Sequence, residues 1–419
     1  MSSDYKALTL ETLPERLSKI EPIAKKLGAD YRNWSVSEIG DGNLNLVFIV
    51  TGDVGKIIIK QALPYVRLVG DSWPLTLERA FFEYNALVRQ EERDPTRVPT
   101  IHFFDRSQGL IAMEYLESHK ILRGKLILGE KVSGLSEALG KFCARTAFRG
   151  SDFFMKTEDK KADVSLFQKN VELMAITEGL IFTDPYFEAE RNHNTAGLDK
   201  IIKILRNDVK MKANVQHMLR KFTSNCETMC HGDLHSGSIM CTETATRVID
   251  PEFAFYGPLG FDIGMLISNY LMAFFSQPGH RKNEIELKEY QDWILEIIDK
   301  TVQVFYQEFK YLWKNERSGI LYPKVLFEEQ GHDSTEALNH VLRKTWKDAV
   351  TICGIEMHRR CLSLAHNADF EDITDLKFRA KLEARNLLAG RELILKASSL
   401  VDIKSVLKIA QTYNEKETF

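Results

Sequence analysis

In the first third of the chain, apolar and polar positions alternate in short runs, which is the period of a β-strand. The runs cover residues 34–39, 44–50 and 57–59, and turn residues at 40–43 and 51–53 separate them. Two later runs, at 100–104 and 110–115, have the length and the apolar character of further strands. Tight turns join strands in an antiparallel meander, so we predict one five-stranded antiparallel sheet.

At residues 74–92 the spacing of apolar residues is that of a helix and not of a strand, and after about residue 135 helical spacing predominates. The later helical segments are predicted at 135–149, 164–178, 198–226, 285–314, 336–366 and 373–398. The pattern therefore predicts an α+β, bilobal fold. A small antiparallel-sheet lobe comprises residues 1–115, a hinge lies near residue 115, and a large, mostly helical lobe comprises residues 116–419.

Length and composition agree with two globular lobes and argue against proteins that bind nucleic acid or membranes. The 419 residues are 44% apolar and carry a net charge of −3, without the basic bias of proteins that bind nucleic acid or anionic membranes. No run approaches the roughly 18 apolar residues of a membrane span, and the N-terminus lacks the pattern of a secretory signal. Six cysteines are few for this length and lack the spacing of a disulfide framework or a zinc ribbon, which is typical of free thiols in a reducing compartment, so we expect a cytoplasmic protein.

Residues 228–258 interrupt the helical pattern with a short segment rich in Gly, Asp, His and Pro. Asp233 precedes a predicted hairpin (239–241 and 248–249), and Asp250 and Glu252 follow it. A hairpin brings its ends together, so the three carboxylates are expected to face one site. Clustered carboxylates repel one another unless a cation compensates, and Mg²⁺ with a bound phosphate is the natural cation. This arrangement indicates phosphoryl transfer, with one acid free to accept a hydroxyl proton.

Before this insert, a glycine turn, a strand lysine and a helix glutamate occur in the order expected for a kinase. Gly40 and Gly42 permit close backbone approach to phosphates, although an ordinary hairpin turn has the same composition. Lys60 ends an apolar strand and is predicted to contact phosphates, with Glu83 on the next helix orienting it. A lone lysine at a strand end is more often simply solvated. The whole ordered set is therefore more specific than any one member.

Two further features have both an ordinary and a functional interpretation. Trp73 lies in a short polar segment beside Pro74, which is typical of a helix start or of an exposed aromatic loop. Arg359 and Arg360 are adjacent within a helical segment. Such a pair usually marks a solvated face, whereas in a kinase its guanidinium groups can neutralise the moving phosphoryl group.

Several strings of this sequence resemble the 5-methylthioribose kinase family. This family lies within the aminoglycoside and choline kinase branch of the protein-kinase-like superfamily. The strings are GDGNLNLVF (40–48), KQALPYVR (60–67), DSWPLTLERA (71–80), HGDLHSGSI (231–239) and DPEFAFYGPLGFDIG (250–264), together with Arg359 and Arg360. They extend from about residue 35 to about residue 390, so the resemblance covers most of the chain.

The resemblance implies transfer of a phosphoryl group from ATP, with Mg²⁺, to the anomeric hydroxyl of 5-methylthioribose. It places the protein in methionine salvage, as a cytoplasmic homodimer. It implies Asp233 as the catalytic base and as a substrate ligand, together with Arg359, Arg360 and a loop bearing Trp73. Asp250 and Glu252 are the implied metal ligands. The implied ATP-binding residues are Gly40, Gly42, Asn45, Lys60, Glu114, Tyr115, Leu116, Asp250, Pro251 and Glu252.

Three alternatives remain open at this point. The same fold can phosphorylate another small alcohol or sugar. The spacing of His231 and His235 is that of a zinc-binding helix, but Gly232 argues against a helix there. A non-catalytic nucleotide-binding protein would have lost the base, the metal acids or the lysine, and all of these are present. Protein kinases have Asn at the position of Ser238, which leaves the number of Mg²⁺ ions open.

Overall fold

The computed structural model describes residues 5–39, 44–66 and 70–416. Backbone contacts divide the chain into two compact units. Unit 1 comprises Met1–His119, Asn170–Leu173 and Arg247–Ala254, and unit 2 comprises Lys120–Lys169, Met174–Thr246 and Phe255–Phe419. Two short segments from the part of the chain after residue 119 thus belong to the N-terminal unit, which the linear division of the sequence did not foresee.

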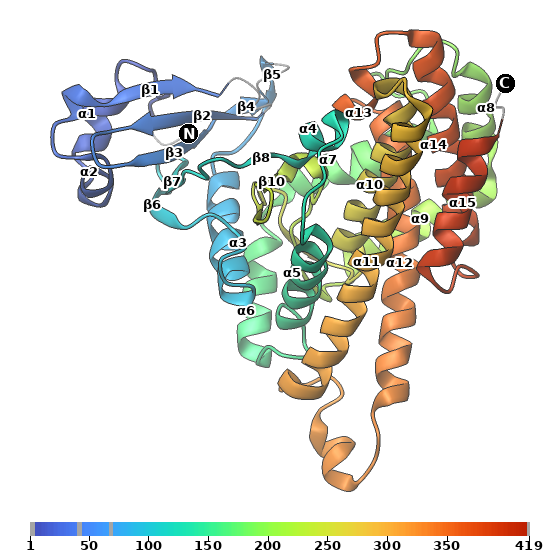
Figure 1. Cartoon of the computed structure of the whole chain (residues 1–419). Coiled ribbons are helices and arrows are strands. Elements are labelled where there is room, and N and C mark those ends of the chain that lie inside the picture. The colour runs from blue at the N-terminus through green and yellow to red at the C-terminus, as the bar shows by residue number, and fades with distance from the viewer. Residues whose placement is uncertain (1–4, 40–43, 67–69, 417–419) are drawn as a thin grey trace. The chain divides into compact units, whose positions relative to one another are not determined.

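Unit 1 is built on an antiparallel sheet with the strand order β1-β2-β3-β7-β6 (Figure 1). The strands are β1 (Ser35–Glu38), β2 (Asn45–Thr51), β3 (Lys56–Ala62), β6 (Ile101–Asp105) and β7 (Leu110–Glu114). Every neighbouring pair runs antiparallel. The predicted five-stranded antiparallel sheet is therefore confirmed.

Alternation along β3 decides which side chains reach the core and which reach the site. Ile57 and Ile59 are completely buried in an apolar cluster with Phe48 and with residues of the helices α1 (Leu13–Ser18) and α2 (Glu21–Leu27). Successive strand residues point to opposite faces of a sheet. Lys60 therefore leaves this cluster and instead bonds to a side chain of helix α3 (Arg79–Arg93).

Helix α3 begins five residues later than the sequence predicted. Pro74, the first residue of the predicted helix, instead ends strand β5 (Gly70–Pro74), which pairs antiparallel with β4 (Tyr65–Val66). Leu75 N still donates to Pro64 O at 3.0 Å, so the backbone there bonds across the hairpin instead of along a helix. The segment bearing Trp73 is thus a strand, and both predictions for it, a helix start and an irregular loop, were wrong.

Unit 2 is mostly helical, as predicted. Helix α5 (Leu135–Arg149) packs along α11 (Glu284–Glu316), and α12 (Thr335–Leu362) packs along α10 (Phe261–His280) and α14 (Leu376–Lys396). The remaining α-helices described after residue 119 are α4 (Leu122–Leu128), α6 (Thr157–Phe167), α7 (Val171–Phe182), α8 (Asp199–Asn207), α9 (Val209–Ser224), α13 (Ala368–Glu371) and α15 (Ile403–Glu415). Together with the antiparallel sheet of unit 1, this confirms the predicted fold class.

Two helices predicted as continuous are each broken by a polar residue. At Asn170, between α6 and α7, the side-chain amide donates to the backbone oxygens of Glu252 (2.9 Å) and Ala254 (3.1 Å). At Asp208, between α8 and α9, the backbone is extended and the carboxylate caps Met211 N at 2.9 Å. The apolar periodicity runs through both breaks, which is why the pattern concealed them.

Helix α10 was missed because it is apolar on nearly every side, so it shows no stripe at the helical period. Its buried face includes Ser268 and Asn269, and the Asn269 amide donates to Met265 O at 3.0 Å. Among the described helices, none combines the length and the apolar composition of a membrane span. All six cysteines are free thiols, and five of them are buried.

Short strands frame the irregular insert at residues 228–258. Strand β9 (Thr228–Cys230) pairs antiparallel with β12 (Phe255–Gly257), and β10 (Ile239–Cys241) pairs with β8 (Lys120–Ile121). Strand β11 (Thr246–Val248) follows β10, so both strands of the predicted hairpin exist. The loop 231–238 therefore begins and ends at a strand, which gives it fixed ends.

Candidate active site

In unit 1, Lys60 is buried and lies among carboxylates, of which Glu83 and Glu252 are buried and Asp250 is partly exposed. Lys60 Nζ donates to Glu83 Oε1 at 2.8 Å and also forms a short ion pair with Asp250. Burial opposes the charge of this lysine, but Asp250, Glu83 and Glu252 raise its pKa above the ordinary value. Lys60 is therefore a fully charged ammonium group, and the expected orienting role of Glu83 agrees with their contact.

Glu252 and Asn45 form the second part of the same group, together with an arginine that the sequence did not reveal. Asn45 Nδ2 donates to Glu252 Oε2 at 3.1 Å, while Asn45 Oδ1 accepts from Arg79 Nη2 at 3.0 Å. Arg79 Nε lies 3.4 Å from Glu252 Oε2, and the Arg79 side chain is completely buried. No local signal separates a buried arginine from a solvated one, because both occur on amphipathic helices.

The carboxylates of unit 1 offer a donor set that suits a hard divalent cation. One ligand oxygen from each of Glu83, Asp250 and Glu252 lies within 4.8 Å of the others. Burial raises the pKa of both Glu83 and Glu252, because crowded carboxylates share a poorly solvated space. Asp250 is 45% exposed at its side chain and has a left-handed φ of +67°. Oxygen ligands of this kind fit Mg²⁺.

In unit 2, backbone hydrogen bonds hold the first residues of the loop 231–238 in place. The amides of His231 and Gly232 donate to the Asp262 carboxylate at 2.7 and 3.1 Å. Gly232 has a φ of +87°, a conformation that side-chain-bearing residues rarely adopt. His231 Nδ1 lies 3.3 Å from Asp233 N. These contacts set the direction in which Asp233 leaves the loop.

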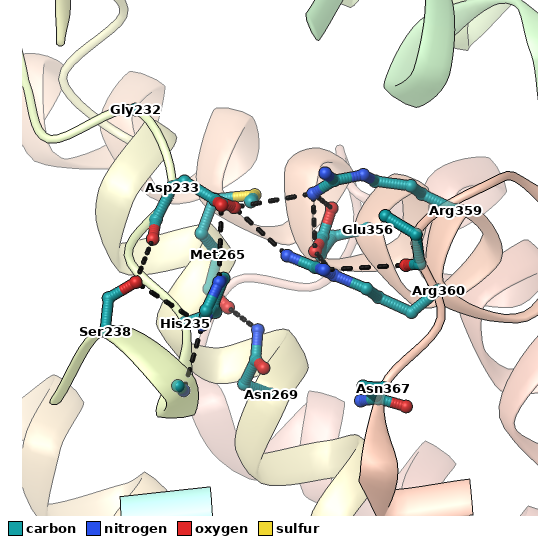
Figure 2. A network of polar contacts seen from close by, with 12 residues as sticks. Gly232, Asp233, His235, Ser238, Met265, Asn269, Glu356, Arg359, Arg360 and Asn367 are labelled. Carbon is teal, nitrogen blue, oxygen red and sulfur yellow. Dashed lines mark hydrogen bonds and ion pairs between the residues drawn. The ribbon is translucent and has the colours of Figure 1, made fainter. Parts of the chain in front are cut away.

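Asp233 lies against the two arginines at the C-terminal end of helix α12 (Figure 2). Its Oδ1 is 3.0 Å from Arg360 Nη2 and 3.4 Å from Arg359 Nη1, and its Oδ2 is 3.2 Å from His235 Nε2. Both arginines are at least 93% buried at their side chains, whereas Asp233 is 18% exposed. The structure thus brings the predicted base and the predicted arginine pair together in one cluster.

Burial alone would raise the pKa of Asp233, but its cationic and hydrogen-bonding neighbours dominate. His235, Arg360 and Arg359 together hold the pKa of this carboxyl well below its usual range. Asp233 is therefore anionic at neutral pH, which is the state that a general base requires.

Glu356 lies one helical turn before the arginine pair and was not identified from the sequence. Its Oε1 accepts from Arg360 Nε at 2.5 Å, and both of its oxygens lie 3.2–3.3 Å from Arg359 Nη1. The side chain is completely buried. Two guanidinium groups therefore face two carboxylates, Glu356 and Asp233, which keeps a buried pair of cations compensated.

We expect Glu356→Gln to weaken acceptor binding by releasing the arginine pair from its fixed orientation. The kcat/KM for the acceptor should fall by about 10- to 100-fold, and the free energy of unfolding by about 2–4 kcal/mol. Steady-state kinetics and thermal unfolding measure both effects. Glu308→Gln, which breaks a comparable ion pair with Arg145 (2.7 Å) elsewhere in unit 2, serves as the matched control. Equal kinetic losses in both variants would contradict this role for Glu356.

Ser238 stands where protein kinases have an asparagine. Its hydroxyl donates to the backbone oxygen of Asp233 at 3.0 Å. The segment from His231 to His235 contains no helix, since it lies between β9 and a short 3₁₀ turn (Ser236–Ser238). In the part of the chain that the structure describes, neither histidine belongs to a group of three possible metal ligands. The zinc-helix interpretation is therefore wrong.

The remaining predicted residues lie in unit 1. Glu114 ends β7, and its carboxylate accepts from Thr100 N at 3.0 Å. Tyr115 follows it, with its ring 5.5 Å from Lys56 Nζ, and Leu116 is buried. Trp73 is half-buried in β5. Pro251 is buried between the two acids, whereas Gly40 and Gly42 lie outside the described residues.

Comparison with known proteins assigns the family. The Phosphotransferase enzyme family matches residues 35–293, which is more than half of the chain. A methylthioribose kinase from Escherichia coli is 43% identical over 98% of this chain and 98% of its own. The chain belongs to the methylthioribose kinase family. A second relative, methylthioribose kinase 1 from Oryza sativa, is 36% identical over 98% of this chain and 96% of its own.

A solved glucosamine kinase in complex with glucosamine, ADP and inorganic phosphate is 13% identical, with a TM-score of 0.48 over 91% of this chain and 86% of that one. The family resemblance inferred from the sequence strings is confirmed by the two methylthioribose kinases. Their similarity extends beyond the strings to almost the whole chain.

Proposed function

We propose that this protein transfers the γ-phosphoryl group of ATP to the anomeric hydroxyl of 5-methylthioribose, giving the 1-phosphate and ADP. The observation that carries the substrate assignment is membership of the methylthioribose kinase family along almost the entire chain. The anionic Asp233 beside two guanidinium groups supports the reaction type, because phosphoryl transfer needs a positioned base and compensation of charge.

In the proposed reaction, Asp233 accepts the proton of the acceptor hydroxyl as that oxygen attacks phosphorus. Arg359 and Arg360 bind the sugar and offset charge that develops on the transferred group. Trp73 contributes an aromatic surface to the substrate site. Asp233 needs no prior deprotonation to act as a base, since its neighbours already hold it in the anionic state.

On the nucleotide side, Lys60 orients the phosphates, and Glu83 orients Lys60. Asn45 and Pro251 contribute to ATP binding next to the proposed metal ligands, Asp250 and Glu252. Backbone groups of 114–116, which are Glu114, Tyr115 and Leu116, hold the adenine edge. Gly40 and Gly42, which lie outside the described residues, are proposed to contribute to phosphate binding.

Asp250 and Glu252 would hold Mg²⁺, and the nearby Glu83 oxygen belongs to the same donor set. When bound, Mg²⁺ supplies positive charge that neutralises the phosphate oxygens. The protein is further proposed to act in methionine salvage, in the cytoplasm, and as a homodimer.

The test of function is ADP release in a coupled assay with Mg²⁺-ATP and one acceptor at a time. We expect turnover with 5-methylthioribose to exceed that with ribose, choline or an aminoglycoside by at least about 100-fold in kcat/KM. Preference for another alcohol would keep the kinase chemistry and reject the substrate. ADP release that no acceptor stimulates would favour a nucleotide-binding protein without this activity.

Removal of divalent cations should abolish turnover, and re-addition of Mg²⁺ should restore it. Asp250→Asn should lower kcat by about 100-fold or more and raise the Mg²⁺ concentration needed for half-maximal rate, since one anionic ligand is lost. Asp53→Asn, at an exposed turn of unit 1, is the control. Full activity in excess EDTA would contradict the assignment of these acids.

A further inference from the structure

Arg123 is a mostly buried arginine beside the loop of Asp233, and the proposed reaction gives it no part. It lies in helix α4, and its side chain is 16% exposed. Its Nε is 3.2 Å from Ser236 Oγ and 3.1 Å from Asp369 Oδ2, and its Nη2 is 3.3 Å from Asn269 Oδ1. Three structural elements therefore fix this guanidinium group in place.

The same guanidinium group faces the ring of His235. Arg123 Nη2 lies 3.4 Å from His235 Nδ1, and the backbone N–H of Gly237 donates to that nitrogen at 2.9 Å. A backbone amide can only donate, so Nδ1 must carry a lone pair. The proton of the neutral ring is therefore on Nε2, which faces Asp233 Oδ2 at 3.2 Å (Figure 2).

The packing at Gly237 leaves little freedom for another arrangement. A Cβ atom at this position would lie 2.6 Å from His235 Cε1 and 3.0 Å from Arg123 Nη1. The Ser238 hydroxyl, 3.4 Å from His235 Nδ1, donates its proton to Asp233 O instead. A proton on His235 Nδ1 would thus point at two hydrogen-bond donors, the Gly237 N–H and the Arg123 guanidinium group, which disfavours that tautomer.

The charged groups around His235 come from four elements. Asp233 lies on its own loop, Arg123 on α4 and Arg360 on α12. Behind the two arginines lie Asp369 on α13 and Glu356 on α12. Burial together with Arg360 and Arg123 lowers the pKa of His235 to about 4, against the opposing effect of Asp233. The Asp233 carboxylate thus lies beside a neutral imidazole that donates a hydrogen bond, and not beside a charged imidazolium.

We propose that Arg123 is a positioning residue of the active site: held by Asp369, it keeps His235 in the neutral Nε2–H form that donates a hydrogen bond to Asp233. His235 then orients the base without taking its proton, because Nδ1 is already an acceptor and Nε2 is already protonated. The proton from the acceptor hydroxyl stays on Asp233 until solvent removes it. The inference rests on the proposed function for the role of Asp233 as base.

The direct test is a histidine ring NMR titration of the nucleotide-free protein between about pH 5 and 8. In the wild type we expect neutral His235 with the proton on Nε2 throughout. Arg123→Gln should raise the pKa of His235 by about 1–2 units, because one of two nearby cations is removed. Arg123→Lys keeps the charge and should leave the pKa within about half a unit of that of the wild type.

Arg149→Gln, which breaks the ion pair with Glu316 (2.7 Å) outside this network, should leave His235 unchanged. An imidazolium ring at pH 7 in the wild type, or a proton on Nδ1, would overturn the proposal, as would an unshifted pKa in folded Arg123→Gln. If Arg123→Gln does not fold, the wild-type titration alone decides. This measurement needs no turnover, so its failure is distinguishable from failure of the proposed function.

A kinetic readout separates positioning from general support of the fold. The kcat of Arg123→Gln relative to that of the wild type should fall from pH 8 to pH 5.5, by up to about fourfold if the pKa of His235 rises by two units, since protonated His235 loses its acceptor role for Gly237. The ratio for Arg123→Lys should stay constant, and ionisation of ATP cancels in both ratios. A loss that is the same at every pH would indicate a structural role only and reject the proposal.

Discussion

Asp233→Ala lowers kcat by about 10²–10⁴-fold and leaves the affinity for ATP within about threefold of that of the wild type. The expectation follows from the contacts that each group makes within its own unit. Asp233 bonds to His235, Arg359 and Arg360, all in unit 2, whereas Lys60, Asp250 and Glu252 belong to unit 1. Loss of the carboxylate therefore removes the proton acceptor without touching the proposed phosphate contacts.

Asp233→Asn tests the same role with the side-chain size kept. Its kcat should fall into the same range, because an amide cannot accept the hydroxyl proton. Single-turnover kinetics and calorimetric titration with ATP measure the two effects separately. Asp199→Asn, exposed in the first turn of α8, is the control and should match the wild type. Turnover of Asp233→Asn within a few-fold of the wild type would remove Asp233 from the role of base.

Lys60→Met is expected to have the second large effect, on ATP and on stability together. The kcat/KM for ATP should fall by about 10²–10³-fold, because the phosphates lose a buried, correctly oriented cation. Three carboxylates, those of Glu83, Asp250 and Glu252, also lose their shared ammonium group. Removing one partner of a buried ion pair, as in this variant, lowers the free energy of unfolding by about 3–5 kcal/mol.

The stability loss in Lys60→Met should depend on pH with a defined sign. In the wild type, burial raises the pKa of Glu83 and Glu252 while the charge of Lys60 lowers it, so loss of Lys60 raises both pKa values further. A carboxyl group whose pKa is higher in the folded protein than in the unfolded chain stabilises the fold at low pH, and this contribution is lost as the pH rises. The Tm difference from the wild type should therefore grow from pH 5 to pH 8, and Mg²⁺ should reduce it.

Lys56→Met provides the matched control for Lys60→Met. Lys56 lies on the same strand, β3, but its side chain is 41% exposed and pairs with the exposed Glu117 at 3.2 Å. Exposed pairs of this kind contribute about 0–1 kcal/mol. If both lysine variants lose the same activity, the proposed contact of Lys60 with ATP is wrong.

The sequence was sufficient for the sheet because its strands are short, alternating and separated by turn residues. The same reasoning failed for α10, whose buried faces leave no stripe, and at Asn170 and Asp208, where apolar periodicity continues across a break. Periodicity reports which face is buried, and it says nothing of where a polar side chain bonds to a distant backbone.

For the site, the sequence by itself determined the residue types that the chemistry needs and their order along the chain. Asp233, Lys60, Asp250, Glu252 and the arginine pair all stand in strings that carry the family resemblance. Their identity is a matter of local sequence, because each role requires one particular functional group.

Only the tertiary structure decided which buried charges support these groups. Arg79 and Arg123 contact residues that lie far along the chain, whereas Glu356 contacts arginines one helical turn away. Each of the three resembles a solvated helix residue in the sequence. Their roles arise from burial, which strengthens every charge interaction and makes each uncompensated charge costly. Burial of a charged residue depends on the packing of distant helices and strands, and no local pattern encodes it.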